Sequence, residues 1–160
     1  MYRYAVFGKE GMVSVSIPDG SNEKAWIYFR KAIGVRKYDK ENYIAMTLSP
    51  QELGLIVNGL KGNGDKADRN TGEKYVSIIH DPNATAETIG VSGGKRDETK
   101  HLYVRRGFIG VSHNKKGEDP LKIGVGVSLG DAEVLITLFK RGIKNLCKYV
   151  RDDTPDDLGI

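Results

Sequence analysis

The sequence predicts an α+β fold made of two ββββα repeats, in which curved antiparallel sheets carry helices packed on their core side. Three observations lead to this prediction. Several short stretches alternate apolar and polar residues, which is typical of strands with one buried face. Two of these stretches run directly into a capped helical pattern. These two strand-to-helix segments, 43–60 and 122–139, align without a gap at a spacing of 79 residues, which indicates a duplication.

The first repeat, residues 2–61, begins with four predicted strands. Clusters of Gly, Pro, Asp, Ser and Asn separate the first three, and such clusters mark turns. The segment 34–42, which contains Arg36, Lys37 and Lys40, is predicted to be a basic connection before the fourth strand. The four predicted strands are 2–7, 12–17, 24–31 and 43–48.

The helix that completes the first repeat has a clear predicted start. Ser49 can cap the helix, Pro50 suits its first position, and Glu52 follows the serine by three residues, which makes a capping box. The glycines at 62 and 64 end the helix, and residues 61–73 are predicted to be a polar linker. One face of this helix is apolar and consists of Leu53, Ile56, Val57 and Leu60.

The second repeat, residues 74–150, follows the same plan. Its predicted strands are 74–80, 87–92, 101–112 and 122–127, with long polar turns at 93–100 and 113–121. Ser128 is the predicted helix cap, with Asp131 three residues later. The predicted apolar stripe of this helix is Val134, Leu135, Leu138, Phe139, Ile143 and Leu146.

Two strands place unusual side chains on the face opposite the core. Alternation puts Trp26, Tyr28 and Arg30 on one face of the 24–31 strand, and their apolar neighbours on the other. The pattern recurs 75 residues later as His101, Tyr103 and Arg105. Aromatic rings beside guanidinium groups form a good surface for stacking nucleic-acid bases. The alternative interpretation is that these rings pack across strands or at a subunit interface.

Length and composition limit the class of protein. A chain of 160 residues can bury a self-sufficient core, so we expect one domain over residues 1–150 and an acidic tail over 151–160. The tail carries a charge of −3 and the body +7, which fits a polyanionic partner. The single Cys147 cannot form an intrachain disulfide, and no stretch is apolar enough for a membrane span. We therefore expect an intracellular, cytoplasmic protein without a membrane partner, in the host cytoplasm if its origin is viral.

The strand-to-helix segment 46–61, MTLSPQELGLIVNGLK, supports a family resemblance. Four strands followed by a helix with this serine- and proline-marked start resemble the single-stranded-DNA-binding coactivators of the positive-cofactor-four type. A chain with two such units is similar to the Whirly proteins and their mitochondrial RNA-binding relatives. The resemblance covers about residues 2–150 and implies a Whirly-like fold whose curved sheets hold single-stranded nucleic acid on their outer faces. It also implies that the helices close the core or join subunits of a homo-oligomer.

The resemblance implies a set of binding residues on and beside two strands. The positions that match the strand surface of the family are Trp26, Tyr28, Arg30, His101, Tyr103 and Arg105. Basic residues on or beside these strands would contact phosphates and make binding salt-dependent. These basic residues are Arg3, Lys31, Arg36, Lys37, Lys95, Arg96, Lys100 and Arg106.

The acidic tail carries a second resemblance. The sequence DDTPDDLGI is similar to the tails of bacterial and phage single-stranded-DNA-binding proteins, which recruit replication and repair partners. The alternative is a disordered, solubilising end. The tail residues expected to bind a partner are Asp152, Asp153, Asp156, Asp157, Leu158 and Ile160.

No pattern in the sequence predicts an enzyme, a metal site or a cofactor. His80, His101 and His113 lack the spacing of a metal motif, and no Ser-His-Asp or Cys-His order is visible. We expect binding of single-stranded DNA or RNA with little sequence preference, in replication, recombination or transcription. The alternatives are a transcription regulator that melts or holds duplex, a protein-interaction module whose aromatic faces are subunit contacts, and a nuclease.

Overall fold

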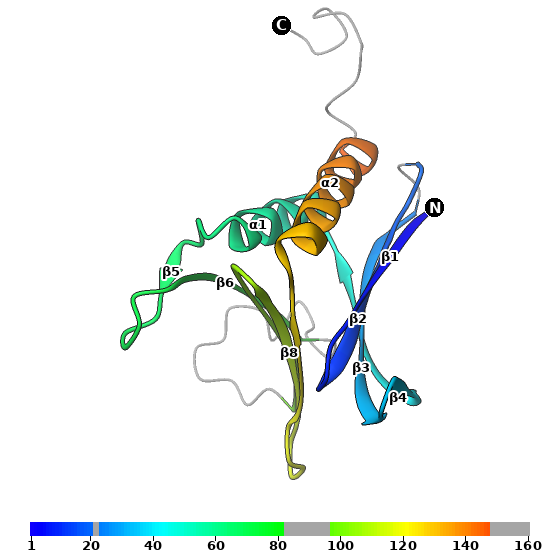
Figure 1. Cartoon of the computed structure of the whole chain (residues 1–160), viewed down its shortest axis with the longest axis vertical. Helices are drawn as coiled ribbons and strands as arrows, with labels where there is room; N and C mark the ends of the chain where they lie inside the picture. The colour runs from blue at the N-terminus through cyan, green and yellow to red at the C-terminus, as the bar shows by residue number, and fades with distance from the viewer. Residues whose placement is uncertain (21–22, 82–96, 148–160) are drawn as a thin grey trace, which may run out of the picture.

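In the part of the chain that the structure describes, nine strands and two helices follow one another in the order that two strand-rich repeats require (Figure 1). The computed structural model describes residues 1–20, 23–81 and 97–147. The first half contains β1 (Tyr2–Phe7), β2 (Gly11–Ile17), β3 (Ala25–Gly34), β4 (Lys37–Leu48) and α1 (Pro50–Leu60). The second half contains β5 (Lys66–Ala67), β6 (Lys74–His80), β7 (Glu98–Arg105), β8 (Phe108–Lys115), β9 (Leu121–Gly126) and α2 (Leu129–Leu146).

The strands form two antiparallel sheets in which neighbours in sequence are neighbours in space. The first sheet has the order β1-β2-β3-β4 and the second the order β5-β6-β7-β8-β9. The two helices pack together at one end of the sheets, where the sheets are far apart, and the sheets approach each other away from the helices (Figure 1). This arrangement confirms the predicted α+β fold of two curved sheets with helices on the core side.

The core lies between the two sheets and the helices. Alternation along the strands buries one face of each sheet, and a single cluster of buried side chains includes residues from both halves. Ile27 and Leu102, the two residues that the sequence points inward, are fully buried, which confirms the strand register. The inner faces are therefore fixed by packing, and the opposite faces are left for solvent or a ligand.

Both helix starts are as predicted. Glu52 donates its backbone N–H to the Ser49 hydroxyl at 3.2 Å, and the Ser49 N–H donates to the Glu52 carboxylate at 3.0 Å, which completes the capping box. The Asp131 N–H donates to the Ser128 hydroxyl at 3.1 Å. Of the described helices, none is long and apolar enough to cross a membrane.

One member of the predicted apolar stripe of α2 is misplaced. Val134 is 37% exposed, whereas Ile136, which the sequence did not place in the stripe, is buried. The buried face runs through Leu135, Ile136 and Phe139, because α2 packs against α1 and the first sheet at once and so buries an arc wider than one stripe.

The predicted connection at 34–42 is wrong, because β3 and β4 continue into it as a hairpin. Gly34 pairs with Lys37 across a turn made by Val35 and Arg36. Two register shifts, between Arg30 and Ala32 and between Ala32 and Gly34, interrupt the alternation that identifies strands in sequence. The hairpin therefore extends past the buried part of the sheet, where polar residues carry no strand signal.

The predicted strand 101–112 is in fact two strands, and the linker holds a third short one. A turn at Arg106 and Gly107 separates β7 from β8, and Gly107 adopts a φ of 80° that favours glycine. Apolar residues on both sides of this turn hid it in the sequence. Within the predicted linker 61–73, β5 pairs with β6. The predicted strand 87–92 lies outside the described residues.

Candidate nucleic-acid interface

The outer face of the first sheet carries a row of aromatic rings. Trp26, Tyr28 and Arg30 alternate on β3 with fully buried residues, and all three are half-buried. The rings of Trp26 and Tyr28 are stacked with centroids 5.8 Å apart and planes 19° apart. Tyr43 of β4 continues the row, 6.3 Å from Tyr28. We call Trp26, Tyr28, Arg30 and Tyr43 the first outer face.

Small side chains on β2 open space beside this row. Ser14 and Ser16 pair with Tyr28 and Trp26, and they leave a groove of about 260 Å³. Arg3 and Arg30 line the groove together with Tyr28. An aromatic ring between two guanidinium groups can stack a base and neutralise its flanking phosphates.

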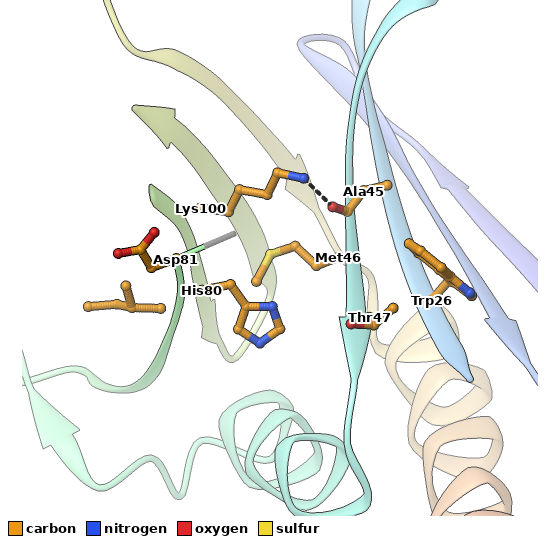
Figure 2. Close-up of a pocket in the computed structure, with 8 residues that line it drawn as sticks. Trp26, Ala45, Met46, Thr47, His80, Asp81 and Lys100 are labelled. Atoms are coloured by element: carbon orange, nitrogen blue, oxygen red, sulfur yellow. Dashed lines mark hydrogen bonds between the residues drawn. The ribbon is translucent and has the colours of Figure 1, made fainter. Parts of the chain in front are cut away.

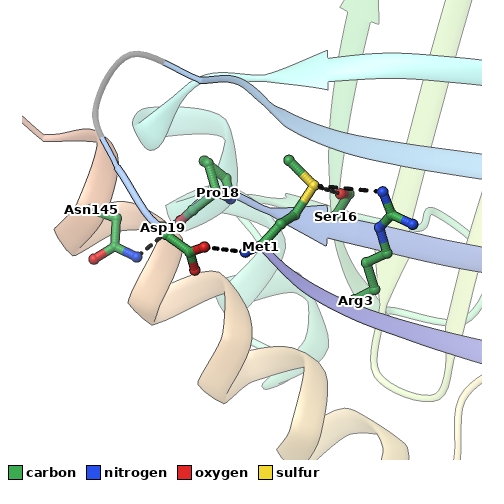
Figure 3. A network of polar contacts seen from close by, with 6 residues as sticks. All are labelled: Met1, Arg3, Ser16, Pro18, Asp19 and Asn145. Carbon is green, nitrogen blue, oxygen red and sulfur yellow. Dashed lines mark hydrogen bonds and ion pairs between the residues drawn. The ribbon is translucent and has the colours of Figure 1, made fainter.

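Polar contacts around Met1 hold the Arg3 end of this face (Figure 3). The Met1 ammonium pairs with the Asp19 carboxylate, and the Met1 thioether accepts a hydrogen bond from Ser16 at 2.8 Å and lies 3.9 Å from the Arg3 guanidinium. Asn145 of α2 donates to the Pro18 carbonyl at 2.9 Å. These contacts tie β1 and the end of β2 to α2, so the Arg3 side of the face is anchored to the helical layer.

The outer face of the second sheet also carries three rings, but on three different strands. Tyr75 of β6 and Tyr103 of β7 have centroids 4.8 Å apart, and Phe108 of β8 lies 6.1 Å from Tyr103. The Arg105 guanidinium lies 5.0 Å from the centre of the Phe108 ring, within cation–π distance. Arg105 also pairs with Glu73 at 3.3 Å. We call Tyr75, Tyr103, Arg105 and Phe108 the second outer face.

His101 lies on the same side of β7 and is partly enclosed. Its ring Nε2 forms a short hydrogen bond with the Ser77 hydroxyl. Burial and then the nearby Lys66 ammonium lower the pKa of His101 below its usual value. Burial also raises the pKa of Tyr103. His101 is thus favoured as a neutral imidazole that offers a flat ring rather than a charge.

The predicted 75-residue correspondence between the two aromatic strands is wrong. Trp26 lies on the third strand of its sheet, opposite Thr47, whereas His101 lies on β7, which corresponds to the second strand, β2. The residue that corresponds to Trp26 in the second sheet is Phe108, opposite Gly126. Phe108 is absent from the predicted binding residues because the turn before it lies inside the predicted strand 101–112. The signal was Gly107, since an isolated glycine within a strand pattern indicates an irregularity.

Glycines make the floor under Phe108. A Cβ atom on Gly124 would lie 2.6 Å from the Phe108 ring, and one on Gly110 would lie 2.8 Å from it. Beside the ring is an apolar pocket of about 230 Å³, which Tyr103 and Lys122 also line. The ring can lie flat on the sheet only because these two positions lack side chains.

A groove of about 470 Å³ lies between the two sheets (Figure 2). The Lys100 ammonium crosses it and donates to the Ala45 carbonyl of β4 at 2.8 Å. His80 Nε2 lies 2.6 Å from the Glu52 carboxylate, which joins the end of β6 to the start of α1. Lys100, predicted as a phosphate contact, therefore bridges the sheets, while Trp26 lines the other side of this groove.

The other predicted basic residues are scattered. Lys31, Arg36 and Lys37 lie on the β3–β4 hairpin. Arg106 donates to the Lys61 carbonyl at 3.0 Å at the end of α1, so it does not join the second outer face. Lys95, Arg96 and the tail residues Asp152, Asp153, Asp156, Asp157, Leu158 and Ile160 lie outside the described residues. Among the residues that the structure describes, no three His, Cys, Asp or Glu side chains cluster as metal ligands.

Two antiparallel meanders with exposed aromatic faces, each leading into a capped helix, define the Whirly-type α+β fold. The chain is similar to WHY3 from Arabidopsis thaliana, with a TM-score of 0.65 and 17% identity over 91% of this chain and 88% of that one. It is equally similar to the plant transcriptional regulator PBF-2, with a TM-score of 0.65 and 21% identity over 91% and 81% of the two chains. These similarities confirm the predicted fold.

A more distant similarity joins the chain to the trypanosome MRP1/MRP2 structures, with a TM-score of 0.51 and 7% identity over 94% of this chain and 87% of that one. No protein-family model and no curated protein sequence matches the chain. The resemblance is therefore one of fold, carried by backbone topology at low sequence identity.

Proposed function

We propose that the chain binds single-stranded nucleic acid across the outer faces of its two sheets. The observation that carries this proposal is the pair of aromatic rows on the outer faces, most of whose rings are half-buried. Rings 4.8 to 6.3 Å apart lie on the side of each sheet away from the core, with Arg30 and Arg105 beside them. Stacking on such rings is worth about 1–3 kcal/mol per base and tolerates any sequence, since every base has a π face.

Unpaired cations beside the first outer face support the same function. Arg3, Arg30 and Lys31 form no salt bridge with any described residue. Cations without a salt-bridge partner are available to phosphates, and each contact releases a counterion. Binding should therefore weaken steadily as salt is added. The proposed activity is binding without catalysis.

A role in transcription is the second candidate. It is favoured by the similarity to PBF-2, which is described as a plant transcriptional regulator. Both roles use the same faces, because a regulator that holds melted duplex also binds single strands. Comparison of single-stranded with double-stranded substrates separates them.

The test is a titration of labelled single-stranded and double-stranded DNA and RNA at several salt concentrations. We expect tight binding of single strands, with the logarithm of affinity falling linearly with the logarithm of salt. Trp26→Ala and Tyr103→Ala should each weaken binding by about 1–3 kcal/mol. Leu129→Ala is the control, because Leu129 is an 82% exposed apolar residue at the start of α2 and belongs to neither outer face.

Three results would overturn the proposal. The first is that the chain binds no single strand, and the second is that its affinity does not change with salt concentration. The third is that the Trp26→Ala and Tyr103→Ala variants fold and bind as the parent does. The last result would instead favour the interpretation of the rings as protein contacts.

A further inference from the structure

The β3–β4 hairpin forms a cleft at one end of the first outer face. β3 has 10 residues and β4 has 12, against 6 in β1 and 7 in β2, so the hairpin continues beyond its neighbours. The two register shifts bend it out of the sheet, as the lower end of β3 and β4 shows in Figure 1. The resulting hairpin cleft has a volume of about 820 Å³ and is lined by Phe7, Met12, Arg30, Ile33, Arg36, Lys37, Tyr38, Asp39, Lys40 and Glu41.

Local contacts hold the hairpin in this bent position. The Tyr38 hydroxyl donates to the Gly8 carbonyl at 2.9 Å, and the Tyr38 ring lies 5.6 Å from the Phe7 ring. The Ala32 N–H donates to the Glu10 carbonyl at 3.0 Å. The cleft is therefore preformed, and a ligand would bind without first ordering the hairpin.

Apolar side chains line the cleft without being covered. Phe7 is 63% exposed and Ile33 is 65% exposed, although both lie next to a well-packed sheet. Large apolar groups that are held open beside polar ones mark binding surfaces more often than scattered exposed residues do. A flat apolar ligand could bury both side chains at once.

The charge around the cleft is positive. Arg30, Arg36, Lys37 and Lys40 line it, and none of them forms a salt bridge within the described part of the chain. The Asp39 carboxylate accepts hydrogen bonds from the Glu41 and Asn42 backbones and from the Asn42 side chain, which satisfy it within its own loop. Asp39 stays ionised and Glu41 is a second carboxylate in the lining, so four cations against two anions leave the cleft with a net positive charge, which fits an anionic ligand.

Arg36 adds backbone strain at the tip. Its φ of 55° is in the left-handed region, which glycine or asparagine adopts at lower cost. A long charged residue at such a position is a reason to look for a role of its side chain. Arg36 lines the cleft, so this strained position carries a basic residue of the cleft.

We propose that the hairpin cleft binds one nucleotide of the same single strand, with its base between Phe7 and Ile33 and its phosphate on Arg36 and Lys37. This inference rests on the proposed function. It extends the bound strand beyond the aromatic row, because Arg30 belongs both to the first outer face and to the cleft. The volume is within the roughly 300–1,000 Å³ of small-ligand sites.

The test compares affinities for oligothymidylates of increasing length. Phe7→Ala and Ile33→Ser should bind long oligonucleotides about tenfold more weakly than the parent, a loss of 1.4 kcal/mol. The slope of affinity against salt should not change, because these substitutions remove no charge. Val35→Ser is the matched control, since Val35 is 91% exposed on the same hairpin and does not line the cleft.

Two substitutions of Arg36 distinguish the effect of its backbone strain on stability from the effect of its charge on binding. The first is Arg36→Gly. It should stabilise the fold, because glycine adopts the left-handed conformation freely, yet it should lower the salt slope by about 0.7, the value of one phosphate on a single strand. Arg36→Lys keeps the charge and should leave the slope unchanged.

The outcomes distinguish this inference from the proposed function. If Phe7→Ala and Ile33→Ser bind as the parent does while Trp26→Ala binds weakly, the cleft is not a nucleotide site and the proposed function stands. If Phe7→Ala changes the oligomeric state and not strand affinity, the cleft is a contact between copies of the chain, which also overturns the inference. If the parent binds no single strand, both fail.

Discussion

The two sheets share a backbone plan but build their outer faces differently. In the first sheet the rings of Trp26 and Tyr28 lie along one strand, whereas in the second Tyr75, Tyr103 and Phe108 lie across three strands. The inner faces are alike, since both present aliphatic residues to the core. The difference shows that packing fixes one side of each strand and leaves the other side free to vary.

A second difference concerns the residues next to the rings. Ala45 pairs with Tyr28 in the first sheet, and Gly124 occupies the corresponding place in the second, opposite Gly110. The Phe108 ring covers both glycines, while no side chain in the first sheet needs such a floor. The second outer face therefore requires glycine at 110 and 124, whereas the first accommodates the side chain of Ala45 at the corresponding position.

The largest expected change in stability comes from truncating a core residue in each sheet, and it tests whether the two inner faces are packed alike. Ile27→Ala and Leu102→Ala should each lower the free energy of unfolding by about 2–5 kcal/mol, because both side chains are fully buried. Denaturant titration measures the loss. A small effect at one of them would show that only one sheet is tightly packed.

The glycine floor gives the next effect. Gly124→Ala should destabilise the fold by about 1–3 kcal/mol, because its new methyl group would collide with the Phe108 ring 2.6 Å away. Ala45→Gly is the matched change in the first sheet and should cost about 0.5–1 kcal/mol from backbone entropy alone. If thermal unfolding shows the same loss of stability for Gly124→Ala and Ala45→Gly, the Phe108 ring moves aside and positions 124 and 45 are equivalent.

The rings themselves test whether the faces bind equally. Phe108→Ala removes the residue that corresponds to Trp26 and the ring partner of Arg105. We expect single-strand affinity to fall by about 1–3 kcal/mol, as for Trp26→Ala. Fluorescence anisotropy at constant salt measures both variants. An unchanged affinity for Phe108→Ala would leave the first sheet as the binding surface.

Protonation of His101 gives the smallest effect and concerns the second sheet alone. Its pKa is lowered in the fold by burial and by Lys66, so the unfolded chain binds the proton more readily. The stability that this histidine contributes is present near neutral pH and is lost as the pH falls below about 6.5. Unfolding measured between pH 7 and pH 5 should show a smaller decline for His101→Gln than for the parent. His80 and His113 are present in both proteins, so the difference reports on His101.

The strand faces and the helix starts could be predicted from the sequence, because both depend on local residue patterns. Strict alternation identified the inward residues Ile27 and Leu102, and the serine caps located both helix starts. It was also sufficient for the rings of Trp26, Tyr28 and Tyr103, because a ring that alternates with buried aliphatic residues must lie on the outer face.

Features that depend on strand pairing were not accessible from local pattern. Phe108 was missed because the turn at Gly107 lies between two apolar stretches that read as one strand. The sequence does not predict the hairpin cleft, because its bend comes from register shifts with β4 that interrupt the alternation of apolar and polar residues. The sequence predicts Lys100 as a phosphate contact, and it does not show that the Ala45 carbonyl lies within reach of this side chain.

We expect the bond from Lys100 to the Ala45 carbonyl to hinder self-association through β4. β4 is an edge strand of its sheet in the described residues, so its outward backbone groups could pair with another chain. A charged side chain laid across such an edge makes addition of a further strand unfavourable, because the ammonium would lose its partner and clash with the incoming backbone. Lys100→Met should therefore keep the packed core but form fibrillar or amorphous aggregates sooner on prolonged incubation. In this view one lysine has the role of a gatekeeper for solubility, which is separate from any contact with a ligand.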